Sequence, residues 1–443
     1  MTTASHKTLQ VLEQIVKVVP VGTNLALLQL MWAMISGAFL SSRGAVHSAL
    51  ARCGFEADEI RRSWRALRWG QWSSDELLQR FRGQVAQTGQ WQSREHGGYR
   101  PVAVDTTAYW RPRLQGWSGK LYRQLAGKAM TGIGLGLIAD VGQVGEQRLP
   151  LLRRVVRGQD AAESQASLQE RTVATAARLL RENEVLLHDG GISIAQLQAA
   201  GAARFVVRLG TNCTARRPYL PAFKGRGRPP TRGSLVRPLA RKWKDRTLPA
   251  TPADVTTAFT FEGRTITAGG WLNVMRADLN IAADHERYAV WVFADPLFKT
   301  PLVLGTNLSV TAAVVFTLYL DRWPVEQLPL VAKQLLGCQR QFVFAHTCCW
   351  RLGELALLVG NILTWLAAVL PAQPTGYWDR HPKKRPDGYV GSWPRPFFQR
   401  NLCLRDDFAK NGRRPAIYPR GLRPIAGLSV LSIPNPAFSG PHC

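Results

Sequence analysis

Residues 99–107 read YRPVAVDTT, and in this stretch the apolar triplet Val102-Ala103-Val104 runs directly into Asp105. A short apolar run bounded by polar and turn-forming residues is typical of a buried strand. The stretch therefore predicts a β-strand that carries a carboxylate at its end.

The segments that follow continue this strand-rich texture. Apolar runs at 132–139 and 149–156 predict successive strands, and residues 164–181 form a long helical stretch without Gly or Pro. A second apolar triplet, Val185-Leu186-Leu187, ends at His188-Asp189, and a further strand is predicted at 204–209. Strands followed by a helix and another strand indicate an α/β layer.

Charge is the most unusual feature of the composition. The 443 residues include 57 Lys plus Arg against 30 Asp plus Glu, which gives a net charge of +27. Such an excess favours a polyanionic partner, and nucleic acid is the commonest one. Hydrophobic residues make up 46% of the chain, which excludes a mainly disordered or low-complexity protein and suits two or three folded domains.

The region 1–95 reads as a helical N-terminal domain. Ile60, Trp64 and Leu67 mark one helix face, and the adjacent face carries three arginines, which are Arg61, Arg65 and Arg68. A turn at Cys53-Gly54 precedes this helix, as in a helix-turn-helix that presents arginines to phosphate. A solvated basic face is the equal alternative.

Residues 210–285 are predicted to be a basic, β-rich insertion between two parts of an α/β domain, 96–209 and 286–371. Within it, residues 216–246 hold eleven Lys or Arg and one acid, Asp245. The segment 224–230 reads KGRGRPP, in which Arg226 and Arg228 lie on a Gly-Pro backbone suited to a narrow minor groove. General phosphate contact is the alternative. A hairpin is predicted to follow, turned at Glu262-Gly263.

Further features bear on the compartment. The seven cysteines form no C-x-x-C pair and no secretory signal begins the sequence, so a reducing cytoplasm is expected. The apolar windows 26–40 and 355–370 are shorter than a bilayer span and contain Gln29 and Asn361, which predicts buried helices and no membrane. The tail, 372–443, is rich in Pro and Arg and is expected to be irregular.

The strongest local pattern is Tyr319-x2-Arg322-x3-Glu326-x6-Lys333, within a helix predicted at 311–336. At 100° per residue these four side chains fall in one sector of a helix, so a carboxylate lies among a hydroxyl and two cations. Pro324 and Pro329 weaken this geometry unless Pro324 begins a new helix. An ion-paired helix surface is the alternative.

This pattern resembles the signature of bacterial insertion-sequence transposases of the Asp-Asp-Glu class, in the branch named for its Tyr-Arg-Glu-Lys motif. The segments ending in Asp105 and Asp189 resemble the first and second acidic strands of that family. The likeness covers residues 99–340. It implies a ribonuclease-H-like fold, with a mixed sheet, flanking helices and three acids converging at one sheet edge.

The resemblance also implies the site chemistry. Asp105, Asp189 and Glu326 would be the catalytic residues and the ligands of two Mg²⁺ ions, which Mn²⁺ is expected to replace, since such ions favour carboxylate oxygens. Tyr319, Arg322 and Lys333 would contact phosphates of the DNA end. The competing strand-end acids, Asp140 and Asp295, do not fit the family order. His188, beside the second acid, reads as an ordinary hydrogen-bonded strand histidine.

One departure concerns the second DNA strand. Some relatives hold a flipped base on a tryptophan just before the signature helix, where this chain reads Pro301-Leu302-Val303-Leu304. Trp291 and Phe298 are nearby candidates, and the hairpin route of cleavage stays open.

The expected function is therefore a Mg²⁺-dependent DNA transposase. It would cleave the terminal inverted repeats of an insertion sequence and join the 3′ hydroxyl ends to double-stranded target DNA, as a homodimer assembled on DNA. Two rival functions are a catalytically inactive, transposase-derived DNA-binding protein and a ribonuclease-H-like nuclease that cuts without joining.

Overall fold

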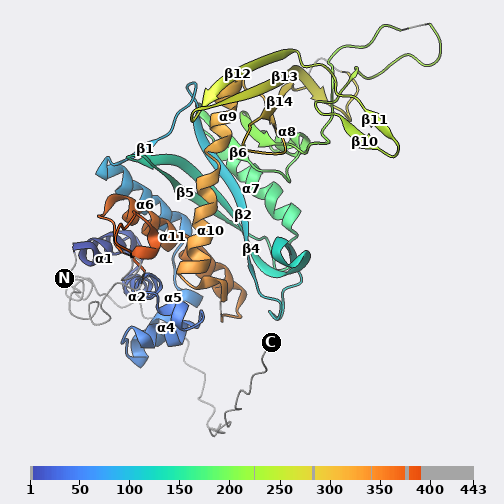
Figure 1. Cartoon of the computed structure of the whole chain (residues 1–443). Coiled ribbons are helices and arrows are strands. Elements are labelled where there is room, and N and C mark those ends of the chain that lie inside the picture. The colour runs from blue at the N-terminus through green and yellow to red at the C-terminus, as the bar shows by residue number, and fades with distance from the viewer. Residues whose placement is uncertain (1–2, 224, 282–284, 341, 375–378, 391–443) are drawn as a thin grey trace, which may run out of the picture. The chain divides into compact units, whose positions relative to one another are not determined.

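The protein is described by a computed structural model that covers residues 3–223, 225–281, 285–340, 342–374 and 379–390. All of these residues belong to one compact unit, Met1–Leu402. It has a mixed α/β architecture, a large mixed sheet with helices on both faces (Figure 1). Most of the predicted 372–443 tail, including Tyr377, Trp378 and Trp393, lies outside the described residues.

The predicted strands form the centre of the sheet. They are β2 (Arg100–Trp110), β4 (Lys128–Val144), β5 (Gln147–Arg157), β6 (Glu184–His188), β7 (Phe205–Arg208), β14 (Tyr288–Ala294) and β15 (Leu302–Thr306). Strand β2 runs antiparallel to β4 and parallel to β6, and β6 runs parallel to β7. The short strands β1 (Trp91–Ser93) and β3 (Lys120–Arg123) pair with β4.

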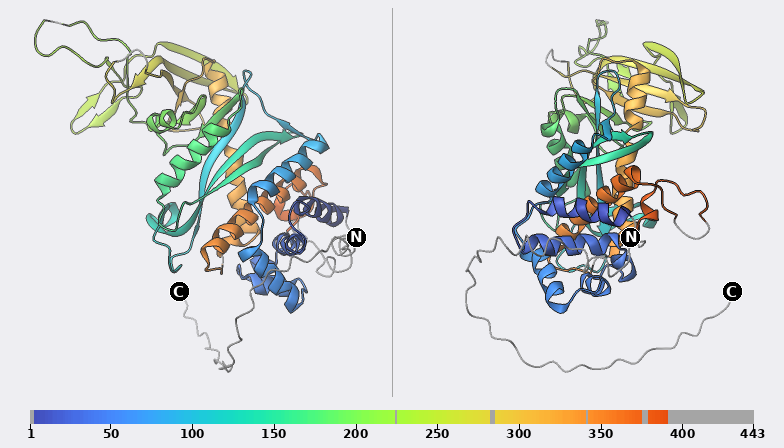
Figure 2. Two further views of the ribbon diagram at one scale, coloured as in Figure 1. Left: turned by 180° about the vertical axis from the view of Figure 1, so that it is seen from behind. Right: turned by 90° about the vertical axis from the view of Figure 1, so that its left-hand side faces the viewer.

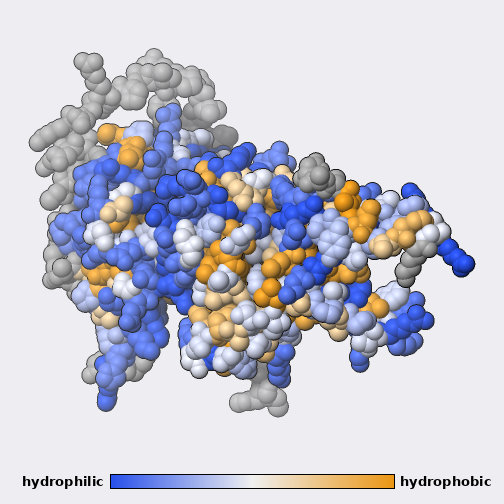
Figure 3. Space-filling model, turned by 90° about the horizontal axis from the view of Figure 1, so that it is seen from above, coloured by the Kyte–Doolittle hydropathy of each residue, from blue (hydrophilic) through white to orange (hydrophobic). Residues whose placement is uncertain are grey.

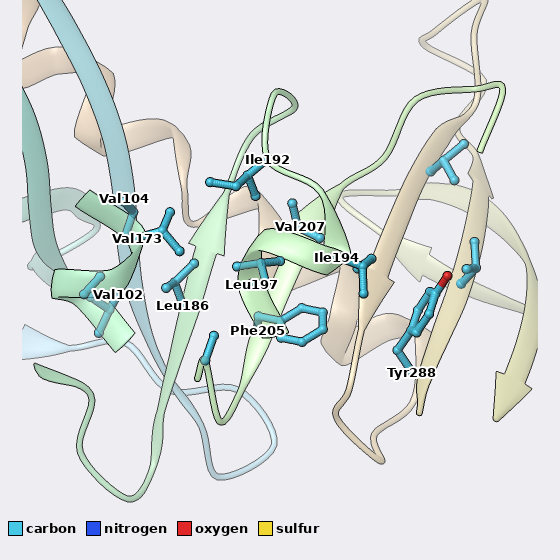
Figure 4. Close-up of a cluster of buried hydrophobic side chains, with 14 of the residues drawn as sticks. Val102, Val104, Val173, Leu186, Ile192, Ile194, Leu197, Phe205, Val207 and Tyr288 are labelled. Carbon is cyan, nitrogen blue, oxygen red and sulfur yellow. The ribbon is translucent and has the colours of Figure 1, made fainter. Parts of the chain in front are cut away.

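One face of the sheet is covered by α7 (Gln165–Leu179) and the short α8 (Ile194–Ala199). Ser164 caps α7 by accepting a hydrogen bond from the Ser167 N–H. The helix approaches β4 so closely that a Cβ on Gly136 would lie 2.0 Å from the Thr172 hydroxyl. Valines and leucines of β2, α7 and β6 fill the space between these elements (Figure 4).

The other face is covered by α6 (Ser74–Thr88) and α11 (His346–Val369), as the two turned views in Figure 2 also show. Of the described helices, only α11 is long and apolar enough to cross a bilayer, yet 94% of its most apolar window is buried. Asn361 on α11 accepts from the Leu152 N–H and donates to the Pro150 carbonyl. Through these two hydrogen bonds Asn361, the polar residue within the apolar window, connects α11 to the edge strand β5.

Helices occupy residues 3–88, as predicted for most of the region 1–95, and the strand β1 follows them. These helices are α1 (Thr3–Val16), α2 (Thr23–Ile35), α3 (Ala38–Ser41), α4 (Val46–Arg52), α5 (Ala57–Trp69) and α6. Helices α2 and α5 pack on each other and on α11. Ile60 and Leu67 of α5 are buried and Trp64 is partly buried, whereas Arg61, Arg65 and Arg68 are exposed.

The basic region 210–285 contains short strands and one long hairpin. Its strands are β8 (Ala215–Arg216), β9 (Leu235–Val236), β10 (Arg241–Trp243), β11 (Arg246–Leu248), β12 (Val255–Phe261) and β13 (Arg264–Arg276). The predicted turn at Glu262-Gly263 is present, with both residues at positive φ. Because β13 pairs with β14, this hairpin extends the main sheet. Arg226 and Arg228 are exposed outside any helix or strand, and Lys224 lies outside the described residues.

The prediction of a single helix at 311–336 is wrong. The segment consists of α9 (Ala312–Leu320), the 3₁₀ turn η2 (Trp323–Glu326), α10 (Gln327–Leu330) and the π-helical turn η3 (Val331–Leu335). The two prolines are the physical reason, because each lacks a backbone N–H and clashes with the preceding turn. Pro324 opens η2, and Pro329 precedes the wider π turn.

Candidate active site beside strands β2 and β6

The sheet register places two of the predicted acids side by side. Val104 of β2 is the partner of His188 of β6 in the parallel pair. Asp189 follows the last residue of β6, whereas Asp105 lies in the middle of β2, which continues beside β4 to Trp110. The prediction that the strand ends at Asp105 is therefore wrong, because pairing with the long strand β4 extends β2 beyond it. The register nevertheless places the two acids at the same level of the sheet. The Asp189 side chain is 37% exposed, which leaves it open to solvent.

Arg322 joins the second acid to the third. Its guanidinium lies 3.5 Å from the Asp189 carboxylate and 2.8 Å from the Glu326 carboxylate, measured between nitrogen and oxygen. The Arg322 side chain is only 3% exposed. Although burial opposes its charge, the neighbouring Asp189 and Glu326 carboxylates raise the pKa of Arg322 above its usual value. It is a fixed cation between two acids.

Tyr319 completes the contacts of Asp189. Its hydroxyl donates a hydrogen bond of 2.9 Å to the Asp189 carboxylate. Burial and the nearby negative charge of Asp189 raise the pKa of Tyr319 to about 12, so the hydroxyl keeps its proton at neutral pH. Burial alone would raise the pKa of Asp189, but Arg322 and the hydrogen bonds from Gly190 and Tyr319 lower it below its usual value. Asp189 is thus held as a carboxylate.

Asp105 behaves in the opposite way. Burial raises its pKa to about 6, and the negative charges of Glu326 and Asp189 add to this effect. A hydrogen bond from the Thr106 N–H and the Arg322 charge offset it only in part. The carboxylates of Glu326 and Asp189 are therefore close enough to Asp105 to raise its pKa, in addition to the larger effect of burial.

Lys333 reaches the same strand two residues further on. Its ammonium donates to the Thr107 hydroxyl at 2.6 Å and lies 4.9 Å from the Trp110 ring centroid. Burial lowers the pKa of Lys333 to about 8, against the opposing attraction of Asp105. All four residues of the sequence signature thus lie near the end of β6 and the second half of β2, despite the broken helix.

Two residues at the site were missed by sequence reasoning. Arg208, at the end of β7, lies 3.6 Å from the Asp189 carboxylate. Asp321, 1% exposed, binds Arg94 at 2.7 Å and His96 at 2.8 Å, and so anchors the signature segment to the chain that precedes β2. An acid next to Arg322 was visible in the sequence, but its partners Arg94 and His96 lie more than 200 positions away.

The competing acids have structural partners. Asp140 is paired with Arg82 and Arg153, and Asp295 lies 3.0 Å from Arg264. His188 is buried, and its Nδ1 lies 2.6 Å from the Asp189 carbonyl. Burial lowers the pKa of His188, which agrees with a neutral, hydrogen-bonded strand histidine.

The two aromatic candidates for a flipped base differ in exposure. Trp291 is buried on β14 and stacks on Phe293, with ring centroids 6.4 Å apart. Phe298 follows β14 in a turn and is 67% exposed.

Hydrophobic side chains on the face seen from above lie in small patches among hydrophilic ones (Figure 3).

The other predicted DNA contacts lie elsewhere. Arg61, Arg65 and Arg68 are carried by α5, whose neighbours are α2, α4 and α11. Arg61 is paired with Asp58, and Arg68 lies over the Trp69 ring at 4.5 Å. Arg226 and Arg228 belong to the exposed segment of the basic region. The structure does not bring these arginines to the three carboxylates.

The three acids fit a divalent metal by the chemistry of their donors. Carboxylate oxygens are the ligands that Mg²⁺ prefers, and Asp189 and Glu326 are 37% and 43% exposed, which gives access from solvent. Within the described residues, however, no group of three His, Cys, Asp or Glu side chains is arranged so that it could hold a metal ion, and this includes Asp105, Asp189 and Glu326. Arg322 supplies the positive charge between Asp189 and Glu326 in this arrangement.

Comparisons with known proteins add no family. No protein-family model matches the chain, and no curated protein matches it significantly.

Proposed function

We propose that the chain is a metal-dependent DNA transposase of the Asp-Asp-Glu class, with a ribonuclease-H-like catalytic domain. The observation that supports this proposal is that Arg322 binds both Asp189 and Glu326, while the sheet register places Asp105 at the level of Asp189. The position of the two acids at the same level of neighbouring parallel strands, Asp105 within β2 and Asp189 after β6, supports the ribonuclease-H-like assignment. The order of strand acid, strand acid and helical acid supports the class.

The three carboxylates are proposed to hold two Mg²⁺ ions. When bound, such a pair of ions supplies charge stabilisation to both the attacking and the leaving oxygen of an in-line phosphoryl transfer. Asp189 is suited to this role because it stays ionised and exposed at neutral pH. Asp105 is suited to it because burial, and to a smaller extent the neighbouring acids, raise its pKa, and a bound cation would favour its charged form.

The signature cations and hydroxyl are proposed to position DNA phosphate. Arg322 presents a planar fork suited to two phosphate oxygens, and Tyr319 is a protonated donor beside it. Lys333 supplies a point charge next to Trp110. For Arg322 to bind phosphate, it must exchange at least one of its carboxylate partners for the DNA, which a bound metal ion favours by neutralising the same carboxylates.

The remaining basic surface is proposed to bind the two element ends and the target duplex. The exposed arginines of α5 and of the 210–285 region are proposed to neutralise phosphates, with a salt-dependent affinity. Two ends must be held together, so we propose a homodimer on DNA, acting at the bacterial nucleoid in the cytoplasm.

One assay tests the proposal. The protein is incubated with Mg²⁺ and a DNA fragment that carries the inverted repeats bracketing its own reading frame. The proposal predicts cut ends and joined products, both lost with EDTA and restored by Mg²⁺ or Mn²⁺. Cutting without joining indicates a nuclease, and binding without cutting indicates an inactive DNA-binding protein.

A further inference from the structure

A polar pocket that is separate from the candidate active site lies at the outer edge of the sheet, along β5. It measures about 650 Å³ and is lined by the start of α6, the end of β5, one side of α7 and the first turns of α11. Among the described strands β5 pairs only with β4, so this side of β5 is a free edge. None of the residues proposed for catalysis lines the pocket.

Arginine dominates its walls. Five arginines from three separate parts of the chain, β5, α7 and α11, line it, and they are Arg154, Arg157, Arg171, Arg178 and Arg351. The acids in the lining are Asp75, 2.8 Å from Arg154, and Glu354, 2.6 Å from Arg157. Glu163, outside the lining, pairs with Arg171. Three carboxylates therefore serve five guanidinium groups.

The two remaining arginines are not neutralised by any described carboxylate within ion-pair distance. Arg178 is exposed on α7, on the rim of the pocket. Arg351 donates to the Leu67 carbonyl and lies over the Trp72 ring, but its Nε is buried without a hydrogen-bond partner in the described part of the chain. The Nε of Arg171 is likewise buried without a hydrogen-bond partner in the described part of the chain. The pocket thus has more positive than negative charge, and two of its arginines have an N–H donor without a hydrogen-bond partner among the described residues.

The electrostatics of Arg351 agree with this excess. Burial lowers the pKa of Arg351, and the positive charge of Arg157 lowers it further, while Glu354 offsets this only in part. An anion in the pocket would relieve the repulsion between these two arginines.

We propose that this pocket binds a phosphate group. Arginine forks match the oxygens of a phosphate with two parallel hydrogen bonds, and such charge-assisted bonds are stronger than bonds between neutral groups. The phosphate comes from a DNA backbone that passes the edge of β5, or from a free phosphate compound. The site needs only these arginines and does not require the chain to be a transposase.

The test uses the two arginines that can be changed without disturbing the interior. Arg178 is exposed and the Arg154 side chain is 43% exposed, so the double variant Arg154→Gln/Arg178→Gln is expected to fold. The matched control is Arg181→Gln, an exposed arginine three residues beyond Arg178 that does not line the pocket. Circular dichroism confirms that all three proteins have the same fold.

Binding is measured first with a short duplex DNA at increasing salt. If the pocket holds backbone phosphate, the double variant lowers the steepness of log K against log salt by about 1 to 2, because each lost phosphate contact removes about 0.9. Arg181→Gln leaves the slope unchanged. An equal fall in slope for Arg181→Gln would mean general surface charge and would overturn the DNA source.

Binding of inorganic pyrophosphate is measured next by calorimetry. If the source is a free phosphate compound, pyrophosphate binds the wild-type protein, and the double variant weakens it by about tenfold or more while the DNA slope stays constant. The proposal is overturned if neither ligand distinguishes the double variant from Arg181→Gln. Loss of DNA cutting is read in a separate assay, so the proposed function can fail while this site stands, and the reverse.

Discussion

Strand β6 has an acid at each end, and the two ends differ in kind. At its start Glu184 is buried and bound by Arg153, which also binds Asp140, itself paired with Arg82. Two carboxylates meet two arginines there, and the side chains of Arg153 and Glu184 are only 7% and 9% exposed. This is a closed, balanced network.

Just beyond the other end of β6, Asp189 is 37% exposed and shares Arg322 with Glu326. Asp105 lies beside it with a pKa raised to about 6 by burial and by its acidic neighbours. The residue types are similar, but here Asp189 and Glu326 share one arginine, Arg322, and solvent reaches these two acids. A closed network stabilises a fold, whereas an accessible one is suited to bind a further cation.

The largest expected difference between the two ends is in activity. Asp189→Ala should abolish DNA cutting, a loss of about 10³-fold or more, because a proposed metal ligand is removed. Binding to the element ends should stay nearly intact. Glu184→Gln is the control and should retain cutting per folded molecule. Equal loss of cutting and binding in Asp189→Ala would make Asp189 a structural residue.

The next difference is in stability. Glu184→Gln should lower the free energy of unfolding by about 3 kcal/mol, because Arg153 loses its buried partner. Since Arg153 lowers the pKa of Glu184, this stabilisation is present at neutral pH and lost as the pH falls through the folded-state pKa. Urea unfolding at pH 7 and at pH 3 measures both. A variant as stable as wild type at pH 7 would remove the contrast between the two ends.

Asp105 should show the opposite sign. Its folded-state pKa of about 6 lies above the ordinary value of 3.8, so the folded protein is destabilised as the pH rises through 6. Asp105→Asn should therefore raise stability above pH 7 by up to about 3 kcal/mol and give no gain below pH 4. Thermal unfolding across this pH range tests it. A loss of stability at pH 8 would show that Asp105 is a structural acid.

The strands that carry Asp105 and Asp189 could be predicted because the signal comes from residues that are neighbours in the sequence. The apolar triplets before Asp105 and Asp189 specified two strands, and Arg322 with Glu326 has a spacing that brings the two side chains together on one helical turn. The β-hairpin turned at Glu262-Gly263 followed from turn chemistry in the same way.

Long-range partners could not be predicted. The pairing of Arg153 with Glu184, and of Asp321 with Arg94, depends on the sheet register and on chain segments far apart. The prolines signalled a break in the helix predicted at 311–336, but not that a 3₁₀ turn and a π turn would keep Lys333 at the site. The arginine pocket at β5 combines four segments, none of which is distinctive alone.

The smallest effect is expected at Arg208, which pairs with Asp189 as Arg153 pairs with Glu184. The Arg208 side chain is 53% exposed and 3.6 Å from its partner, so Arg208→Gln should change the free energy of unfolding by less than about 0.5 kcal/mol. Urea unfolding beside Arg153→Gln gives the direct comparison. A large loss in Arg208→Gln would make the Asp189 end a second structural network.

Binding of Mn²⁺, followed by electron paramagnetic resonance, tests most directly whether the three acids form a metal centre. The account predicts that the wild-type protein and Glu184→Gln bind Mn²⁺, whereas Asp105→Asn, Asp189→Asn and Glu326→Gln each bind it much more weakly. Mn²⁺ binding that is unchanged in these three variants, or absent from the wild-type protein in the presence of DNA, would contradict it.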